Sequence, residues 1–134
     1  MYLQPKRSRY KKVRKGSLPN LELKSTKLKF GTIGLKSIQS GTISAKQIES
    51  ARQAITRKTK RKGKLWVRIF PNLPITKKPT EVRMGKGKGS VSHWAVKIGK
   101  GKIIFELCGV TLATATAAFK TGGAKLPIKT KIIL

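Results

Sequence analysis

The sequence predicts an α+β fold in which two helices accompany a mostly antiparallel sheet of about five or six strands. Three observations support this class. The 134 residues suit one domain with a real core, to which 38% hydrophobic residues can contribute. Several short segments alternate apolar and polar residues, as strands do. Only two segments carry helical signals, and no solenoid-type repeat is present.

The first segment is a basic arm, predicted over residues 1–22, which precedes a single domain over residues 23–134. Its charge excludes folding in isolation, so we expect an extended arm that orders against a polyanion. Tyr2 and Tyr10 favour binding, because an aromatic beside Arg can lie on a sugar or base. The alternative is a solvated tail. The candidate binding residues of the arm are Lys6, Arg7, Arg9, Lys11, Lys12, Arg14 and Lys15.

One or two short strands are expected over residues 27–43, where glycines mark turns or bulges. A helix then begins after Ser44, because Gln47 stands at the capping-box spacing. Gly63 is expected to end it. Its predicted buried stripe is Ala45, Ile48, Ala51 and Ile55.

Basic residues gather at the far end of this helix in numbers that exceed what the helix dipole requires. Because they repel one another in water, we expect this end to lie against phosphates. The alternative is an ordinary solvated face. The candidate residues are Arg57, Lys58, Lys60, Arg61, Lys62 and Lys64.

Residues 64–70 alternate β-branched and aromatic side chains and predict the strongest strand, with Trp66 and Arg68 on one face. Pro71 and Pro74 are expected to end the ladder and to start a loop that runs to residue 90. The later elements are predicted as strands 92–98 and 102–108 joined in a hairpin, a helix from Thr111 to Gly122, and a last strand over 125–134.

Alternating glycine and lysine distinguish the end of this loop. Glycine costs backbone entropy and lysine does not bury, so this pattern fits close approach to a phosphate-bearing surface. Ser90 stands where a P-loop or a dinucleotide fingerprint needs glycine, which excludes both motifs. The alternative is a flexible surface loop. The candidate residues are Lys77 and Lys78, followed by Arg83, Met84, Gly85, Lys86, Gly87, Lys88 and Gly89.

The charge balance narrows the function further. There are 32 Lys and Arg against 4 acids, all glutamate, and the net charge is +28. A chain of this charge implies a polyanionic partner, with nucleic acid the leading candidate. Four scattered glutamates argue against a metal-dependent or paired-carboxylate hydrolase, so we expect no catalytic residues, metal site or cofactor. Aromatics are only 6%, which argues against binding built mainly on stacking.

Four single residues receive structural interpretations. His93 lacks a good catalytic orienter, although Glu106 could contact it across the predicted hairpin. Cys108 is expected to be a small buried residue at a strand end. Trp66 and Trp94 are read as core or sheet-face aromatics, and neither is expected to be a stacking platform.

Read together, these segments resemble the bacterial-type L-sixteen family of large-subunit ribosomal proteins. The resemblance covers nearly the whole chain. It rests on LQPKR at 3–7, FGTIGLK at 30–36, AKQIESARQAITR at 45–57, GKLWVRIFP at 63–71, PITKKPTEVRMGKGKG at 74–89 and AKLPIKT at 124–130.

The resemblance implies a non-enzymatic role in the large subunit, bound to large-subunit rRNA near the 5S rRNA and beside other ribosomal proteins. It implies that the loop at 76–90 extends towards the peptidyl transferase centre and A-site tRNA. Arg83 stands where some bacterial relatives carry a hydroxylated arginine. Neither a membrane nor a homo-oligomer is expected. The alternative is a free-standing architectural nucleic-acid-binding protein, which should show a recognition helix or apolar wedges.

The compartment is expected to be the mitochondrion, with a plastid or the bacterial cytoplasm as alternatives. The family-like sequence begins at Leu3 without an amphipathic transit peptide before it. The composition, rich in Lys and Ile, resembles products of AT-rich organellar genomes.

Overall fold

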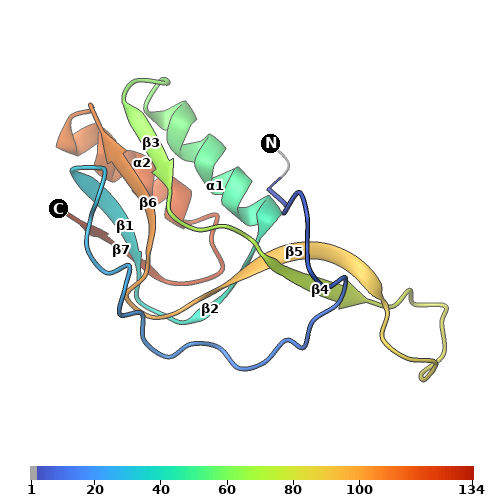
Figure 1. The fold of residues 1–134 in the computed structure, drawn as a ribbon. Coiled ribbons are helices and arrows are strands. Elements are labelled where there is room, and N and C mark those ends of the chain that lie inside the picture. Colours follow the sequence, from blue (N-terminus) through green and yellow to red (C-terminus); the bar gives the residue numbers. More distant parts are fainter. Residues whose placement is uncertain (1–2) are drawn as a thin grey trace.

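The computed structural model describes residues 3–134 and confirms the α+β class, with two helices and seven strands (Figure 1). Tyr2 lies outside the described residues. The order is β1 (Ile33–Ser37), β2 (Gly41–Ser44), α1 (Ala45–Lys58), β3 (Lys64–Val67), β4 (Leu73–Lys77), β5 (Ser90–Ile98), β6 (Ile103–Cys108), α2 (Leu112–Gly123) and β7 (Thr130–Ile133). No helix in this part of the chain is long and apolar enough to cross a membrane.

The strands form two antiparallel sheets in place of the single predicted one. One sheet has the order β3-β6-β1-β7, and the other has the order β2-β5-β4. Helices α1 and α2 lie side by side, and their buried residues join those of the strands in one apolar cluster (Figure 1). Gly122 permits the close helix contact, because a Cβ there would lie 2.5 Å from Cγ1 of Ile55.

Helix α1 begins as predicted. The Ser44 side chain accepts a hydrogen bond from the Gln47 amide, and the Gln47 side chain accepts one from the Ser44 amide, which completes the capping box. Ile48, Ala51 and Ile55 are fully buried, so the 3.6-residue period correctly identified the core face.

The predicted hairpin of residues 92–98 and 102–108 is wrong. Strand β5 pairs with β2 and β4, whereas β6 pairs with β1 and β3, so the two strands belong to different sheets. The turn between them is held by other segments: the Gly101 amide donates to Ser37, and the Lys100 amide donates to Asn20. These contacts direct the chain from one sheet to the other instead of folding it back on itself.

The predicted loop over residues 71–90 contains strand β4, which was missed because of its proline. Strand β4 lies at the edge of its sheet, and Pro74 is tolerated there because an edge strand has amides that need no ladder partner. The remaining connection runs from residue 78 to residue 89. Strands β3 and β7 are shorter than expected, although the Arg68 amide still donates to Ile104 beyond the end of β3.

Strand β5 connects the body of the molecule to this connection. Its first four residues are exposed, whereas Ala95, Val96 and Ile98 are buried. In Figure 1 the β4–β5 ribbon extends from the body and carries the loop at its outer end.

Candidate nucleic-acid interface

Three of the four glutamates pair with basic residues on the folded body, whereas Glu81 in the loop is exposed and forms no salt bridge within residues 3–134. Oε2 of Glu22 lies 3.0 Å from Nζ of Lys102, and Oε1 of Glu49 lies 2.7 Å from Nη2 of Arg52. Glu106 pairs with Arg68. Within residues 3–134 these are the only salt bridges, so the predicted binding cations of the arm, the helix end and the loop have no acidic partner there. Within the described residues their charge is not compensated by any acidic side chain.

The arm contains no helix or strand over residues 3–19, and its basic residues are exposed. It nevertheless lies against the loop. Nζ of Lys12 donates to the carbonyl of Lys88 at 2.8 Å, and Nζ of Lys88 donates to the carbonyl of Val13 at 2.5 Å. Farther along, Nζ of Lys97 donates to the carbonyl of Ser17 at 3.0 Å. Two of the predicted basic segments are therefore brought together.

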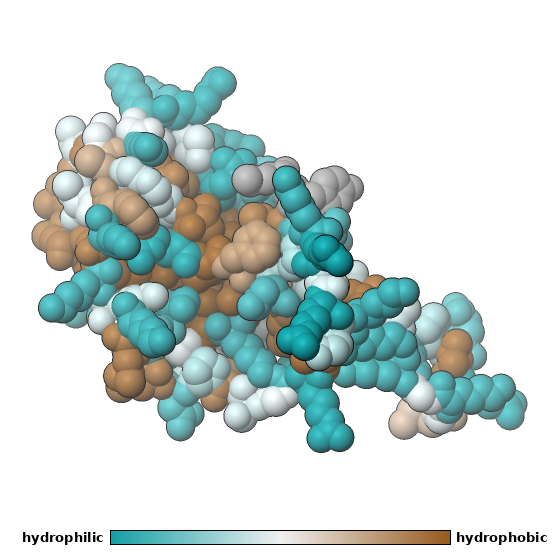
Figure 2. All heavy atoms as spheres, in the orientation of Figure 1, coloured by the Kyte–Doolittle hydropathy of each residue, from teal (hydrophilic) through white to brown (hydrophobic). Residues whose placement is uncertain are grey.

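The tip of the loop stands in solvent with an unusual backbone. Gly85, Lys86 and Gly87 all have positive φ, at 99°, 53° and 80°, a region that favours glycine. The side chain of Lys78 donates to the carbonyl of Gly85, and Met84 is 97% exposed. Figure 2 shows hydrophilic side chains predominating along this projecting part, while apolar ones are more numerous over the body.

The basic end of α1 forms a separate region. Lys58 ends the helix, and Lys60 and Arg61 both have positive φ, at 53° and 62°. A groove of about 660 Å³ separates this end from α2, with Thr114 and Ala117 on its far side. Its basic lining residues are Arg57, Lys58, Lys60 and Lys62. In Figure 1 this end of α1 and the loop lie at opposite ends of the molecule, so the structure does not bring them together.

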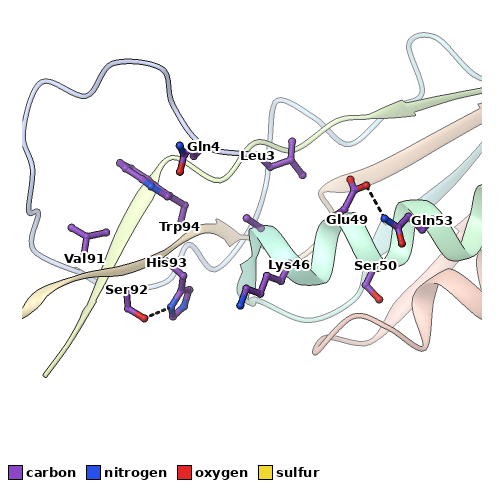
Figure 3. A pocket seen from close by; sticks show the side chains of 11 residues that line it. Leu3, Gln4, Lys46, Glu49, Ser50, Gln53, Val91, Ser92, His93 and Trp94 are labelled. Atoms are coloured by element: carbon purple, nitrogen blue, oxygen red, sulfur yellow. Dashed lines mark hydrogen bonds between the residues drawn. The ribbon is translucent and has the colours of Figure 1, made fainter. Parts of the chain in front are cut away.

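His93 lies in a different setting from the one expected. The register pairs it with Ile75 of β4, so the predicted contact with Glu106 is wrong. Its Nδ1 lies 3.4 Å from Oγ of Ser92 beside a cavity of about 570 Å³ (Figure 3). The carboxylate of Glu49 in the same cavity accepts from Gln53. The described residues contain no group of three or more His, Cys, Asp or Glu that could hold a metal, and Cys108 is half-buried rather than fully buried.

An aromatic cluster of exposed Phe30 and half-buried Trp66 was not expected from the sequence. The rings of Phe30 and Trp66 stack at 19°, with centroids 6.1 Å apart. The Arg68 guanidinium lies 5.0 Å from the Phe30 centroid, and the ammonium groups of Lys29 and Lys64 lie 5.7 Å and 5.2 Å from Phe30 and Trp66. The only sequence signal for this cluster was the alternation that placed Trp66 and Arg68 on one face.

Glu106 holds this cluster in place. Its side chain is fully buried, and it accepts hydrogen bonds from the amides of Phe30 at 2.6 Å, Gly31 at 2.8 Å and Lys29 at 3.2 Å, as well as from Arg68. Burial opposes ionisation of Glu106, but the amides of residues 29–31 and Arg68 outweigh it and hold the pKa of Glu106 below its ordinary value. The carboxylate therefore attaches residues 29–31 to the sheet.

Comparison with known proteins decides the family. The family model described as "Ribosomal protein L16p/L10e" matches residues 5–133. The chain belongs to this family. Among its relatives is a protein of Bartonella henselae named "Large ribosomal subunit protein uL16", 54% identical over 131 residues that cover 98% of this chain and 96% of the relative. A protein of the same name from Buchnera aphidicola is 55% identical with the same coverage.

Membership of the L16p/L10e family agrees with the strongly basic composition. A ribosomal protein works among RNA phosphates, which can supply the anions that the arm, the helix end and the loop lack. Membership of this family also supports a structural role for the protein in the ribosome.

Proposed function

We propose that the protein is a structural constituent of the large ribosomal subunit that binds large-subunit rRNA. The observation that carries the proposal is the absence of acidic partners, within residues 3–134, for the cations of the arm, the helix end and the loop. In a member of a ribosomal protein family, these exposed charges fit RNA phosphates.

The placement of the basic regions suggests how the protein acts. The end of α1 lies at one end of the molecule and the loop at the other, and the arm lies against the base of the loop at Lys88. A rigid body with cations at both ends bridges separate RNA segments. Because A-form RNA offers phosphates and 2′-hydroxyls rather than readable base edges, we infer recognition by shape.

The loop is proposed to extend towards the peptidyl transferase centre and the A-site tRNA, with the 5S rRNA nearby. Supporting this are its outward position on the β4–β5 ribbon and the glycines at its tip. A Cβ added at Gly85 or Gly87 would meet nothing within 4 Å. The positive φ values, and not packing, thus make glycine suitable there, and the bare backbone can approach RNA closely.

The test is incorporation into large subunits. Replacing the four groove cations Arg57, Lys58, Lys60 and Lys62 by alanine should reduce co-sedimentation with large subunits at moderate salt. The control replaces four exposed lysines outside the proposed interface, Lys120, Lys125, Lys129 and Lys131. Removal of the same number of charges there should have a much smaller effect. Equal losses of co-sedimentation in the two variants would show that binding is nonspecific electrostatic attraction and would contradict the proposed interface. Recovery with chromatin would favour the architectural alternative.

Arg83→Ala tests the role of the loop. This residue is exposed, so the variant should fold and enter the subunit. It should slow late assembly or tRNA accommodation, because a cation that meets tRNA or rRNA phosphate is lost. Arg83→Lys should retain most of the function. Wild-type subunit maturation and translation rates in Arg83→Ala would contradict this role.

We further propose that the ribosome in question is mitochondrial, on the basis of the Lys- and Ile-rich composition. The bacterial cytoplasm is the alternative, and it fits the bacterial source of the relatives. Fractionation of source cells tests this: the protein should co-purify with ribosomes from washed mitochondria. Recovery with plastid or bacterial ribosomes would replace the mitochondrial assignment.

A further inference from the structure

The outer face of the four-stranded sheet carries the aromatic cluster of Phe30 and Trp66. Paired residues of antiparallel strands point to the same face, so Gly34, Glu106 and Trp66 lie together on one side of β1, β6 and β3. The alternate residues Leu35, Phe105 and Leu107 belong to the core, as does Ile104 farther along the Glu106 face of β6. The aromatic cluster therefore lies on the side of the sheet that faces away from the core.

The position of Phe30 is fixed by the backbone. Three consecutive amides, those of Lys29, Phe30 and Gly31, donate to Glu106. Gly31 fits tightly against β6, because a Cβ there would lie 2.8 Å from the Leu107 amide nitrogen. The segment is thus held close to the sheet, while the residue Phe30 remains 51% exposed.

Core packing does not account for this exposure. A half-exposed phenyl ring gives up much of the free energy that burial would supply, and apolar surface rimmed by charge marks interaction sites. The rim here is cationic: Lys29 and Lys64 are exposed and lie over the Phe30 and Trp66 rings. Flat rings beside free cations fit a ligand that is both planar and anionic.

We propose that Phe30 and Trp66 form a stacking site for one unpaired nucleotide of RNA. The base lies against the exposed part of Phe30 beside the half-buried Trp66, and Lys29 and Lys64 leave the rings to meet the flanking phosphates. Arg68 stays in place, because Glu106 binds it. The inference rests on the proposed function, since it assigns one contact within the same RNA complex, and it gives Trp66 a stacking role contrary to the expectation from the sequence.

Fluorescence tests the stacking directly. The chain has two tryptophans, so Trp94→Phe leaves Trp66 as the only one. Titration with a large-subunit rRNA transcript should quench the Trp66 emission, because a stacked base quenches indole. Heparin, a polyanion without bases, should bind without comparable quenching. Equal quenching by both, or none by rRNA that binds, would overturn the proposal.

Substitutions test the energetic contribution. Phe30→Leu keeps an apolar side chain but removes the flat ring, and it should weaken rRNA binding about 5- to 100-fold. Phe30→Tyr should restore wild-type affinity. Phe70→Leu is the matched control, because Phe70 is 49% exposed and Phe30 is 51% exposed. It should change affinity less than about twofold.

The outcomes separate the two proposals. If wild-type protein binds neither rRNA nor large subunits, the proposed function fails and this inference fails with it. If Phe30→Leu binds rRNA like wild type and only its thermal stability falls, the ring is structural and this inference alone is overturned. Normal rRNA binding with failed incorporation would identify a protein partner at this surface, which also overturns it.

Discussion

Two contacts between distant parts of the chain differ in almost every physical respect. At Glu106 a buried carboxylate accepts from three amides and an arginine, and it fixes residues 29–31 to the sheet. Between arm and loop, Lys12 and Lys88 donate to exposed carbonyls with no acid present. The difference shows that the glutamates that form salt bridges stabilise the folded body, whereas the arm–loop contact uses only ammonium-to-carbonyl hydrogen bonds. Under the proposed function, RNA phosphates supply the anions where the arm and loop meet.

Glu106→Ala should produce the largest loss of stability. It removes the acceptor of three amides and leaves Arg68 without a partner, so the free energy of unfolding should fall by roughly 3–5 kcal/mol. Glu49→Ala is the control, because Glu49 also pairs with an arginine but lies on a helix surface. It should cost about 0.5 kcal/mol. Urea denaturation measures the free energy of unfolding of both variants. Equal losses would show that the buried Glu106 contact stabilises the fold no more than a surface salt bridge.

Glycine-to-alanine substitutions compare how tightly the backbone is packed in the same two regions. Gly31→Ala should lower the free energy of unfolding by about 2–3 kcal/mol, because the new Cβ meets β6 backbone and separates residues 29–31 from Glu106. Gly85→Ala should cost only about 1 kcal/mol, from its positive φ alone. Thermal unfolding of both variants checks the order. A greater loss at Gly85 would show that the loop is packed in solution.

Lowering the pH should weaken the Glu106 contact progressively, whereas the Glu106→Ala substitution removes it completely. Because the folded state lowers the pKa of Glu106, its contribution is complete above the unfolded pKa of about 4.3 and is lost as the pH falls through the lower folded pKa. The free energy of unfolding should therefore decline from about pH 5 towards pH 3. Glu106→Ala should show a shallower decline, while Glu49→Ala should keep most of it. Parallel curves for wild type and Glu106→Ala would contradict this account.

The loop should give the smallest change in stability. Lys86→Ala combined with Lys88→Ala should alter the free energy of unfolding by less than about 0.5 kcal/mol, because neither ammonium has an acidic partner within residues 3–134. The log-log salt slope of rRNA binding should fall by about 1.4–1.8. Lys125→Ala with Lys129→Ala is the control, and an equal fall in its slope would argue against a specific role for the loop.

Local sequence signals predicted the elements that depend on local contacts. The capping box of Ser44 and Gln47 involves residues three apart, so the start of α1 was readable from the sequence. The pairing of β5 and β6 depends on distant segments, such as Asn20 at the turn, and the hairpin was therefore predicted wrongly. Pro74 was read as a strand breaker because the sequence does not show which strand lies at an edge.

The candidate site follows the same division. Charge clusters are visible in the sequence, and the predicted basic residues of the arm, helix end and loop are exposed, except that Lys78 is half-buried. Their grouping is not visible, because the contact of arm and loop joins residues 76 positions apart. The stacking of Phe30 on Trp66 depends on Glu106 gathering three amides from far along the chain. No local pattern could reveal that arrangement.

Strand β5 sets the reach of the molecule. The buried half of β5 belongs to the body, and its exposed half carries the loop. The number of residues in the exposed half therefore sets the distance from the body to the loop. At about 3.3 Å per residue, deleting two residues from the outer end of each of β4 and β5 would retract the tip by roughly 7 Å with every side chain on its original face. Deleting one from each would retract it half as far and turn the outer side chains over. Changes of two residues in each strand therefore alter the reach of the loop without changing the face on which each side chain lies.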